Sequence, residues 1–124
     1  AKRKVTNLTD VSEITCVVQK GMADEIVQSL LEAGIQGATV HSGVGTGIRE
    51  RMGLLGVAVE VEREIVQVLV SKDQVDRIFE RMYLAGRLDT PGMGYIYAAP
   101  LVQAATYIPA HLLEDKDSLS SLGV

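Results

Sequence analysis

An internal duplication is the feature of this sequence that most restricts how the chain can fold. The two halves align without a gap, and each predicts a strand, a turn, an amphipathic helix ended by an Ala-Gly pair, a loop and a second strand. Two such halves in tandem give the order βαββαβ. The matched positions are Val18 with Val70, Lys20 with Lys72, Ile26 with Ile78, Leu30 with Met82, and Ala33-Gly34 with Ala85-Gly86.

Hydrophobic periodicity places the elements within each half. Runs rich in β-branched residues predict strands, and apolar residues at helical spacing predict helices. Gly34 follows the first predicted helix, where a C-cap glycine is common. We predict strands at 11–19, 37–41, 64–70 and 95–98, and helices at 21–33 and 73–85.

This order predicts an α+β, ferredoxin-like fold in which two helices cover one face of a four-stranded antiparallel sheet. The strands carry apolar residues at nearly every position, so the other face also requires a cover. The simplest cover is another copy of the chain, and we expect a cyclic homo-oligomer. The strand residues that suggest this are Val17, Val18, Val66, Val68, Leu69 and Val70.

Composition excludes several classes of function. The 124 residues fit one domain, which we place at 11–112, after a flexible N-terminus at 1–10 and before a loosely ordered tail at 113–124. The formal net charge of −4 and an aromatic content of 4% argue against nucleic-acid binding. Without a signal peptide or an apolar run long enough to insert into a membrane, we expect a cytoplasmic protein.

Few residues are candidates for metal or catalytic chemistry. Cys16 lies in an apolar strand pattern, which indicates a packed thiol rather than a nucleophile. His41 and His111 are far apart and have no ligand-spaced partners, so we expect no metal site. Neither a Walker loop nor a nucleophile elbow is present, and we predict that the protein is not an enzyme.

The stretch 42–51 is the strongest candidate for a ligand site. It contains Gly43, Gly45 and Gly47, followed by Arg49 and Arg51, and it lies between two predicted strands. Glycines allow backbone N–H groups to approach an anion, and arginine can hold one with two hydrogen bonds. The alternative is that the glycines mark a mobile turn without a ligand.

Several segments, in this order, resemble the PII signal-transduction family of nitrogen regulators. The resemblance spans residues 14–109, and it rests on the ordered set of segments rather than on any one of them. These segments are 30–40, Gly45-Thr46-Gly47, Glu64-Ile65-Val66, Ala85-Gly86-Arg87-Leu88 and Gly92-Met93-Gly94.

The resemblance implies a homotrimer that binds adenine nucleotides (ADP, AMP or ATP) between subunits. One wall of each cleft would be the base of the T-loop, and the other would be the B-loop of a neighbouring subunit. The implied nucleotide- or anion-binding residues are Gly45, Gly47 and Arg49 at the T-loop base, Thr39 at the position near the adenine, and Arg87, Gly92 and Gly94 in the B-loop. For Arg87, the alternative is a cation that interacts favourably with a helix C-terminus.

The sequence departs from the family at several of these positions. Tyr95 follows Gly94 where the family has a lysine, and residues 104–109 lack the family's two phosphate-binding cations. Each lost charge-assisted contact is worth about 1.5–3 kcal/mol, so ADP, AMP or another small anion fits as well as ATP. Arg49 replaces a metal-ligating glutamine, and the T-loop lacks a modifiable Tyr or Ser.

These observations predict a sensor that controls a partner protein, an enzyme or a transporter, through its T-loop. The docking residues would be Arg51, Met52, Leu54 and Leu55. This apolar segment has another explanation, in which it packs on its own oligomer or extends the following strand. The alternative functions are a trimeric ferredoxin-like scaffold without a nucleotide role and a small-molecule-binding module of the ACT type.

Overall fold

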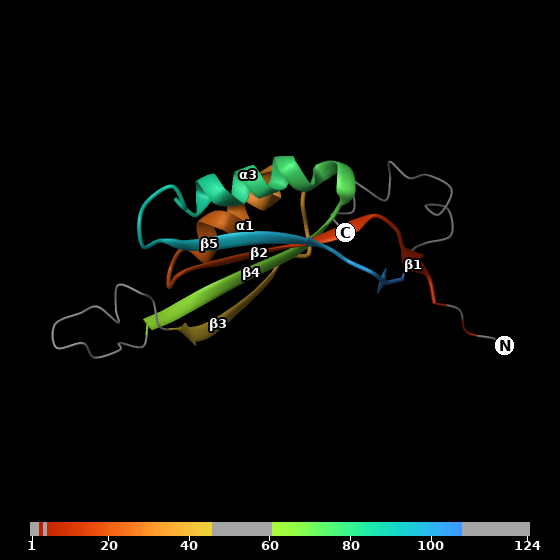
Figure 1. Ribbon diagram of the computed structural model, residues 1–124, viewed down its shortest axis with the longest axis horizontal. Coiled ribbons are helices and arrows are strands. Elements are labelled where there is room, and N and C mark those ends of the chain that lie inside the picture. Colours follow the sequence, from red (N-terminus) through yellow and green to blue (C-terminus); the bar gives the residue numbers. More distant parts are fainter. Residues whose placement is uncertain (1–2, 4, 46–60, 108–124) are drawn as a thin grey trace.

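The computed structural model describes residues 3, 5–45 and 61–107. It contains a four-stranded antiparallel sheet in the order β3-β4-β2-β5, with α1 and α3 together on one face (Figure 1). This is the predicted ferredoxin-like arrangement. The elements are β1 (Asn7–Leu8), β2 (Val11–Gln19), α1 (Ala23–Glu32), β3 (Thr39–Gly45), β4 (Val61–Ser71), the 3₁₀-helix η2 (Lys72–Gln74), α3 (Val75–Ala85), β5 (Gly94–Pro100) and β6 (Ala104–Ala105).

The hydrophobic core lies between the sheet and the two helices. Alternate residues of β2 and β4 point toward the helices, and Ile14 and Cys16 pair across the strands with Val68 and Val66. Because strand residues alternate between faces, all of these side chains enter the same core. The fully buried large side chains are Ile14, Cys16, Val18, Ile26, Leu30, Val66, Val70, Ile78 and Met82.

The sheet face away from the helices is more polar at its centre than the sequence pattern predicts. Val17 and Leu69 lie on this open face and are half-buried, as expected. Between them, however, the Thr15 hydroxyl donates to Glu13 Oε1 at 2.8 Å, and Gln67 Nε2 donates to the same carboxylate oxygen at 3.4 Å. The open face is therefore an apolar surface with a hydrogen-bonded polar centre.

The glycine-rich stretch 42–51 begins inside the sheet rather than as a loop. Strand β3 continues through Gly43 to Gly45, and Gly45 pairs with Val61 of β4. The prediction that the strand ends at His41 is therefore too short. Glycine lowers the propensity for strand but does not prevent pairing when a neighbouring strand supplies the hydrogen bonds.

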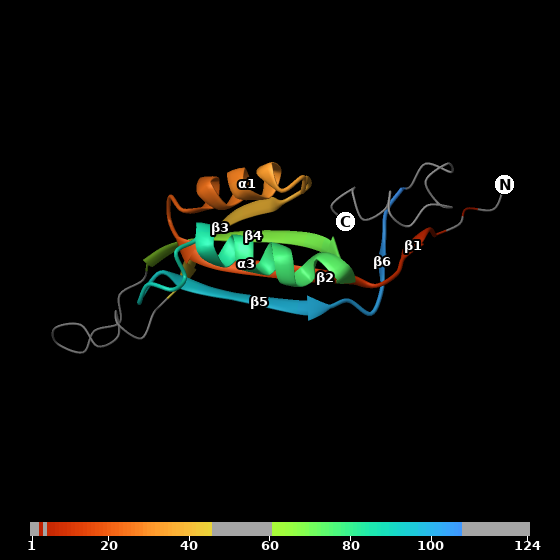
Figure 2. The ribbon, with the colours of Figure 1, turned by 90° about the horizontal axis from the view of Figure 1, so that it is seen from above.

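A second, two-stranded sheet lies beyond the far ends of β2 and β5 (Figure 2). Strand β1 pairs with β6 through Asn7 with Ala105 and Leu8 with Ala104. The pattern at 1–10 does not predict this pairing, because two-residue strands leave no periodicity in a sequence. The tail predicted at 113–124 lies outside the described residues.

Gly94 occupies a position where a side chain cannot be accommodated. Its φ is +136°, and an added Cβ would lie 2.0 Å from the carbonyl oxygen of Val17. We expect Gly94→Ala to lower the free energy of unfolding by about 3 kcal/mol or more, because β5 would have to move away from β2. Urea unfolding followed by circular dichroism measures this change.

Gly34 provides the matched control for this prediction. It has a φ of +83°, but an added Cβ would meet nothing within 4 Å. Gly34→Ala should cost only about 1 kcal/mol, which is the conformational part of the penalty. Equal losses of unfolding free energy in the two variants would show that the close approach at Gly94 adds nothing to the cost of a side chain there.

Burial of Cys16 makes stability depend on alkaline pH. Burial raises the pKa of the Cys16 thiol from 9.0 to about 11. In this range the unfolded chain loses the thiol proton first, so stability falls as pH rises through 9 toward 11. At about pH 10 we expect the loss to be about 1.4 kcal/mol, measured by urea unfolding against a neutral-pH reference.

The comparison with Cys16→Val isolates this effect from other groups that titrate at high pH. Valine is apolar and similar in volume, and it cannot ionise. The stability of Cys16→Val minus that of the wild type should rise by about 1.4 kcal/mol from neutral pH to about pH 10, whichever protein is the more stable at neutral pH. A constant difference would mean that the thiol does not govern the alkaline response.

Candidate functional site

Two of the segments predicted to bind a ligand lie at the same end of the sheet. Gly45 ends β3, and Gly94 begins β5. Figure 1 shows the α3–β5 connection at the end of the sheet where β4 begins. The ligand loop, defined as residues 87–94, therefore lies at the same end of the sheet as Gly45.

The ligand loop has a backbone that is fixed at several points. Arg87 has a φ of 55°, which is uncommon for a residue with a side chain, and Gly92 has a φ of 84°. The backbone N–H of Thr90 donates to Arg87 O at 3.0 Å, and that of Met93 donates to Thr90 O at 3.3 Å. Two successive turns thus shape the loop before it joins β5 at Gly94.

Arg87 itself is available to a ligand. Its side chain is 66% exposed, and its Nη2 lies 4.0 Å from Glu25 Oε1 at the start of α1. An exposed pair at this distance contributes about 0–1 kcal/mol, so an anion with better geometry can replace the carboxylate. The alternative role, a cation at the C-terminal end of α3, agrees with the same position.

The two halves of the predicted site are separated within one chain. Gly45 lies on the outer strand β3 and Gly94 on the opposite outer strand β5, with β4 and β2 between them. Three strand spacings correspond to about 14 Å. Within one chain, the two glycines are therefore separated by the width of the sheet.

Thr39 lies apart from the other candidates. It begins β3, and its six-residue separation from Gly45 corresponds to about 20 Å of extended strand. It pairs with Gln67, and His41, two residues further along β3, lies with its Nε2 3.2 Å from Gln67 Oε1. A ligand that contacts both Thr39 and Gly45 must therefore lie along β3.

The remaining predicted residues lie outside the described part of the chain. These are Gly47 and Arg49 of the nucleotide set, and Arg51, Met52, Leu54 and Leu55 of the docking set.

The turn between β2 and α1, residues 19–23, makes hydrogen bonds to β4 on one side and to the ligand loop on the other. Glu64 Oε1, on β4, accepts hydrogen bonds from the N–H groups of Gly21 at 2.5 Å and Ala23 at 3.2 Å. N–H groups at the start of α1 have no acceptor within the helix, so Glu64 acts as a cap from another strand. On the other side, Gln19 Nε2 donates to the carbonyl oxygen of Gly92 at 3.0 Å.

A surface ion pair lies beside this turn. Lys20 Nζ is 2.8 Å from Glu62 Oε2, near the start of β4. The hydrogen bond and charge of Glu62 raise the pKa of Lys20, and Lys20 in turn lowers the pKa of Glu62. Gln19, Lys20 and Glu62 were not among the predicted site residues, although two polar residues at the end of a buried strand, such as Gln19 and Lys20, are a usable signal.

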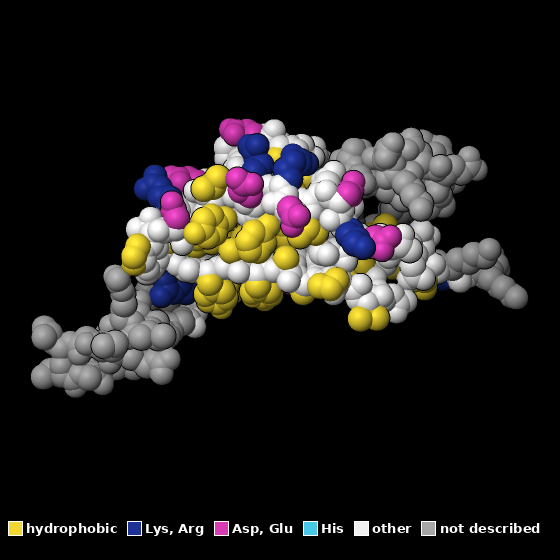
Figure 3. Space-filling model, turned by 45° about the horizontal axis from the view of Figure 1, so that its top comes forward, with side chains coloured by type: hydrophobic (Ala, Val, Ile, Leu, Met, Phe, Trp, Pro, Cys, Tyr) yellow, Lys and Arg dark blue, Asp and Glu magenta, His cyan; other side chains and the backbone are white. Residues whose placement is uncertain are grey.

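Charge on the helix side of the molecule is mixed. In Figure 3, the Lys and Arg side chains of the described residues are interspersed with Asp and Glu and do not gather into one basic patch. Among the described residues, no group of three His, Cys, Asp or Glu side chains is arranged to hold a metal ion. No described helix is long and apolar enough to span a membrane.

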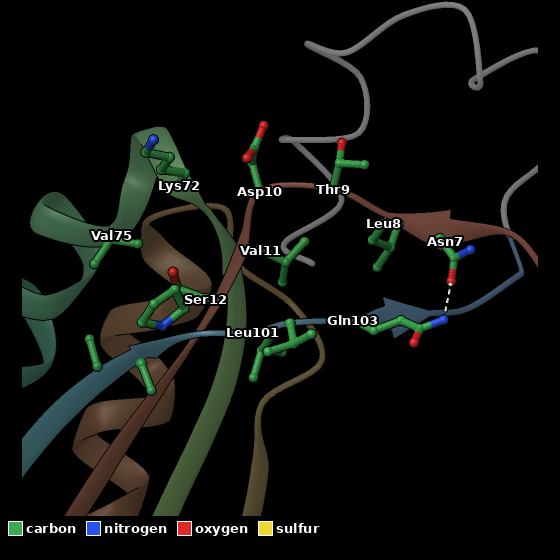
Figure 4. Close-up of a pocket in the computed structure, with 14 residues that line it drawn as sticks. Asn7, Leu8, Thr9, Asp10, Val11, Ser12, Lys72, Val75, Leu101 and Gln103 are labelled. Carbon is green, nitrogen blue, oxygen red and sulfur yellow. Dashed lines mark hydrogen bonds between the residues drawn. The ribbon is translucent and has the colours of Figure 1, made fainter.

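A hollow of about 720 Å³ lies at the opposite end of the sheet, away from the predicted site (Figure 4). Its walls come from β1, the start of β2, the end of β5 with the residues that follow it, and the first residues of η2 and α3. It contains none of the residues predicted to bind a ligand. The labelled lining residues are Asn7, Leu8, Thr9, Asp10, Val11, Ser12, Lys72, Val75, Leu101 and Gln103.

Solved structures share this fold. Arabidopsis thaliana PII bound to citrate aligns with a TM-score of 0.59 and 22% identity, over 74% of this chain and 78% of that chain. Bacillus subtilis GlnK in complex with ATP aligns with a TM-score of 0.60 and 21% identity, over 73% of this chain and 81% of that chain. Among curated proteins, no sequence relative was found.

A comparison with family models gives a more specific result. The model of the nitrogen regulatory protein P-II family matches residues 11–109, which is most of the chain and includes both helices and all four strands of the main sheet. The match also contains the whole stretch from the glycine-rich strand β3 to the ligand loop. This chain therefore belongs to the nitrogen regulatory protein P-II family.

Proposed function

We propose that this protein is a cytoplasmic regulator, not an enzyme, and that it senses an adenine nucleotide or another small anion. The ligand would bind in clefts between the copies of a homotrimer. Its binding would change the T-loop and thereby control a partner protein. The match to the P-II family over residues 11–109 is the observation that carries this proposal.

The position of the two half-sites supports a cleft between subunits. Gly45 and the ligand loop share one end of the sheet but lie on opposite outer strands. In a cyclic oligomer, one edge of each chain can face the opposite edge of its neighbour. Each cleft would then combine Gly45 of one copy with Arg87, Gly92 and Gly94 of the next.

The open face of the sheet supports the oligomer. Val17 lies between Ile65 and Tyr95 in the strand pairing, and Tyr95 stacks on Tyr97 with ring centroids 6.4 Å apart. Tyr95 and Tyr97 are 59% and 47% exposed in a single chain. Burial of this apolar surface against other copies would supply the main free energy of assembly.

The charges near the half-sites favour a modest anion affinity. Arg87 and Lys20 are the exposed cations described there, and each lies beside a carboxylate. The lysine that the family places after the second glycine is Tyr95 in this sequence. A ligand with fewer phosphates, such as ADP or AMP, is therefore as suitable as ATP. GlnK of Bacillus subtilis has been solved with ATP, and PII of Arabidopsis with citrate, so both ligands are probes of choice.

Calorimetry with ATP, ADP, AMP and citrate tests the ligand. We expect at least one nucleotide to bind the wild-type protein with an affinity tighter than millimolar. Arg87→Ala should weaken binding by about 10- to 100-fold, because a charge-assisted hydrogen bond contributes about 1.5–3 kcal/mol. Arg49→Ala should weaken binding in the same range.

Arg77→Ala is the matched control, because Arg77 is an exposed arginine near the start of α3, far from the ligand loop. It should bind as the wild type does. If ATP, ADP and AMP all fail to bind at millimolar concentration, the nucleotide hypothesis is wrong. In that case the alternative, a trimeric scaffold or a module for another small molecule, takes its place.

Light scattering coupled to size exclusion tests the oligomer. We expect a mass of about 40 kDa, three times the 13.3 kDa of one chain. Val17→Lys should shift the protein toward the monomer, because burial of an unpaired ammonium in an apolar interface is costly. Gln28→Lys introduces the same charge on the exposed side of α1 and should leave the mass unchanged. A wild-type monomer would contradict the proposal.

A further inference from the structure

The end of the ligand loop is held against β2 in two different ways. Gly94 pairs with Val18, and its missing side chain allows the backbone to contact Val17. Two residues earlier, the carbonyl oxygen of Gly92 accepts the hydrogen bond from Gln19 Nε2 at 3.0 Å. The first interaction fixes where β5 begins, and the second fixes the direction of the peptide that precedes it.

The backbone of Gln19 is itself well anchored. It is the last residue of β2 and pairs with Arg63 of β4, and its carbonyl oxygen accepts from the N–H of Met22 at 3.1 Å. Directly after it, Glu64 holds the N–H groups of Gly21 and Ala23. The side chain of Gln19 therefore extends to the ligand loop from a backbone position that the central strands and the start of α1 hold in place.

We propose that Gln19 is a positioning residue for the ligand loop. By holding the Gly92 carbonyl, it keeps the peptides around Gly92 and Gly94 in the conformation that a ligand meets. This inference rests on the proposed function for its effect on affinity, but the contact between Gln19 and Gly92 stands without it. None of the segments on which the resemblance to the family rests includes Gln19.

The physical reason is preorganisation. Gly92 lacks a side chain and can adopt many backbone conformations, so a free loop would lose entropy each time a ligand ordered it. A hydrogen bond made before binding removes part of that cost. Gln19 does not need to touch the ligand to affect its affinity, because it changes the population of the loop that is ready to bind.

Gln19→Met tests this role, since methionine has a similar length and no charge but cannot donate a hydrogen bond. The first measurement is amide hydrogen exchange of residues 90–95 without ligand. Exchange there should become about threefold to tenfold faster, in line with the loss of one neutral hydrogen bond. The second is calorimetry with the nucleotide that binds the wild type best, where affinity should fall by a similar factor.

Gln28→Met is the matched control. Gln28 also makes an exposed side-chain hydrogen bond, to Glu32 within α1, and lies outside the loop. It should change neither the exchange of residues 90–95 nor the affinity. Gln19→Lys restores a donor of similar length and should return exchange toward the wild-type rate.

The outcomes separate this inference from the proposed function. Normal exchange in Gln19→Met would overturn the positioning role, even if nucleotides bind. Faster exchange with unchanged affinity would overturn the claim that the loop conformation governs binding. If the wild type binds no nucleotide, the proposed function fails, and the exchange rates still decide whether Gln19 holds the loop. Equal loss of global stability in Gln19→Met and Gln28→Met would exclude general destabilisation as the cause of a loop-specific change.

Discussion

The pairing of β2 with β4 on one side and β5 on the other is the constraint on which the rest of the structure depends. Ile14, Cys16 and Val18 of β2 are fully buried, and their positions set where both helices can pack. The close contact of Gly94 with Val17 then fixes the register of β5. A shift of β5 by one residue would turn Ile96, which packs against the core, toward the open face.

This central strand also determines the arrangement of the candidate site. Because β2 and β4 occupy the middle of the sheet, β3 and β5 lie at its opposite edges. Gly45 and the ligand loop share an end of the sheet but lie at opposite edges within one chain. Separation of this kind is compatible with the proposed site between copies of the chain, and the hollow of about 720 Å³ lies at the other end of the sheet.

The turn at 19–23 gives the two sides a physical connection within each chain. Glu64 and Glu62 reach it from β4, and Gln19 reaches from it to Gly92. Each of these contacts is modest, because most of the side chains are exposed to water. Their effect comes from their location, since they join the start of β4 to the ligand loop.

The sequence by itself determined the fold class and the order of the elements. Strands alternate with period two, as Val66, Val68 and Val70 do. Helices repeat with period 3.6, as Ile26 and Leu30 do, and both sets of side chains pack into one core. Because of the duplication, the same pattern of strands and helices occurs twice in the sequence. The prediction that residues 42–51 form a loop was too broad, because pairing with β4 extends β3 through Gly45 against the low propensity of glycine.

Tertiary structure alone decided which candidates lie close together. It placed Thr39 at the far end of β3, put Gly45 and Gly94 on opposite edges, and brought Gln19 to Gly92, its partner 73 residues away in the sequence. Local patterns carry no information about such contacts, because they depend on strand order and on the geometry of turns. The sequence therefore names the residues with suitable chemistry, and strand order decides which of them can act on one ligand.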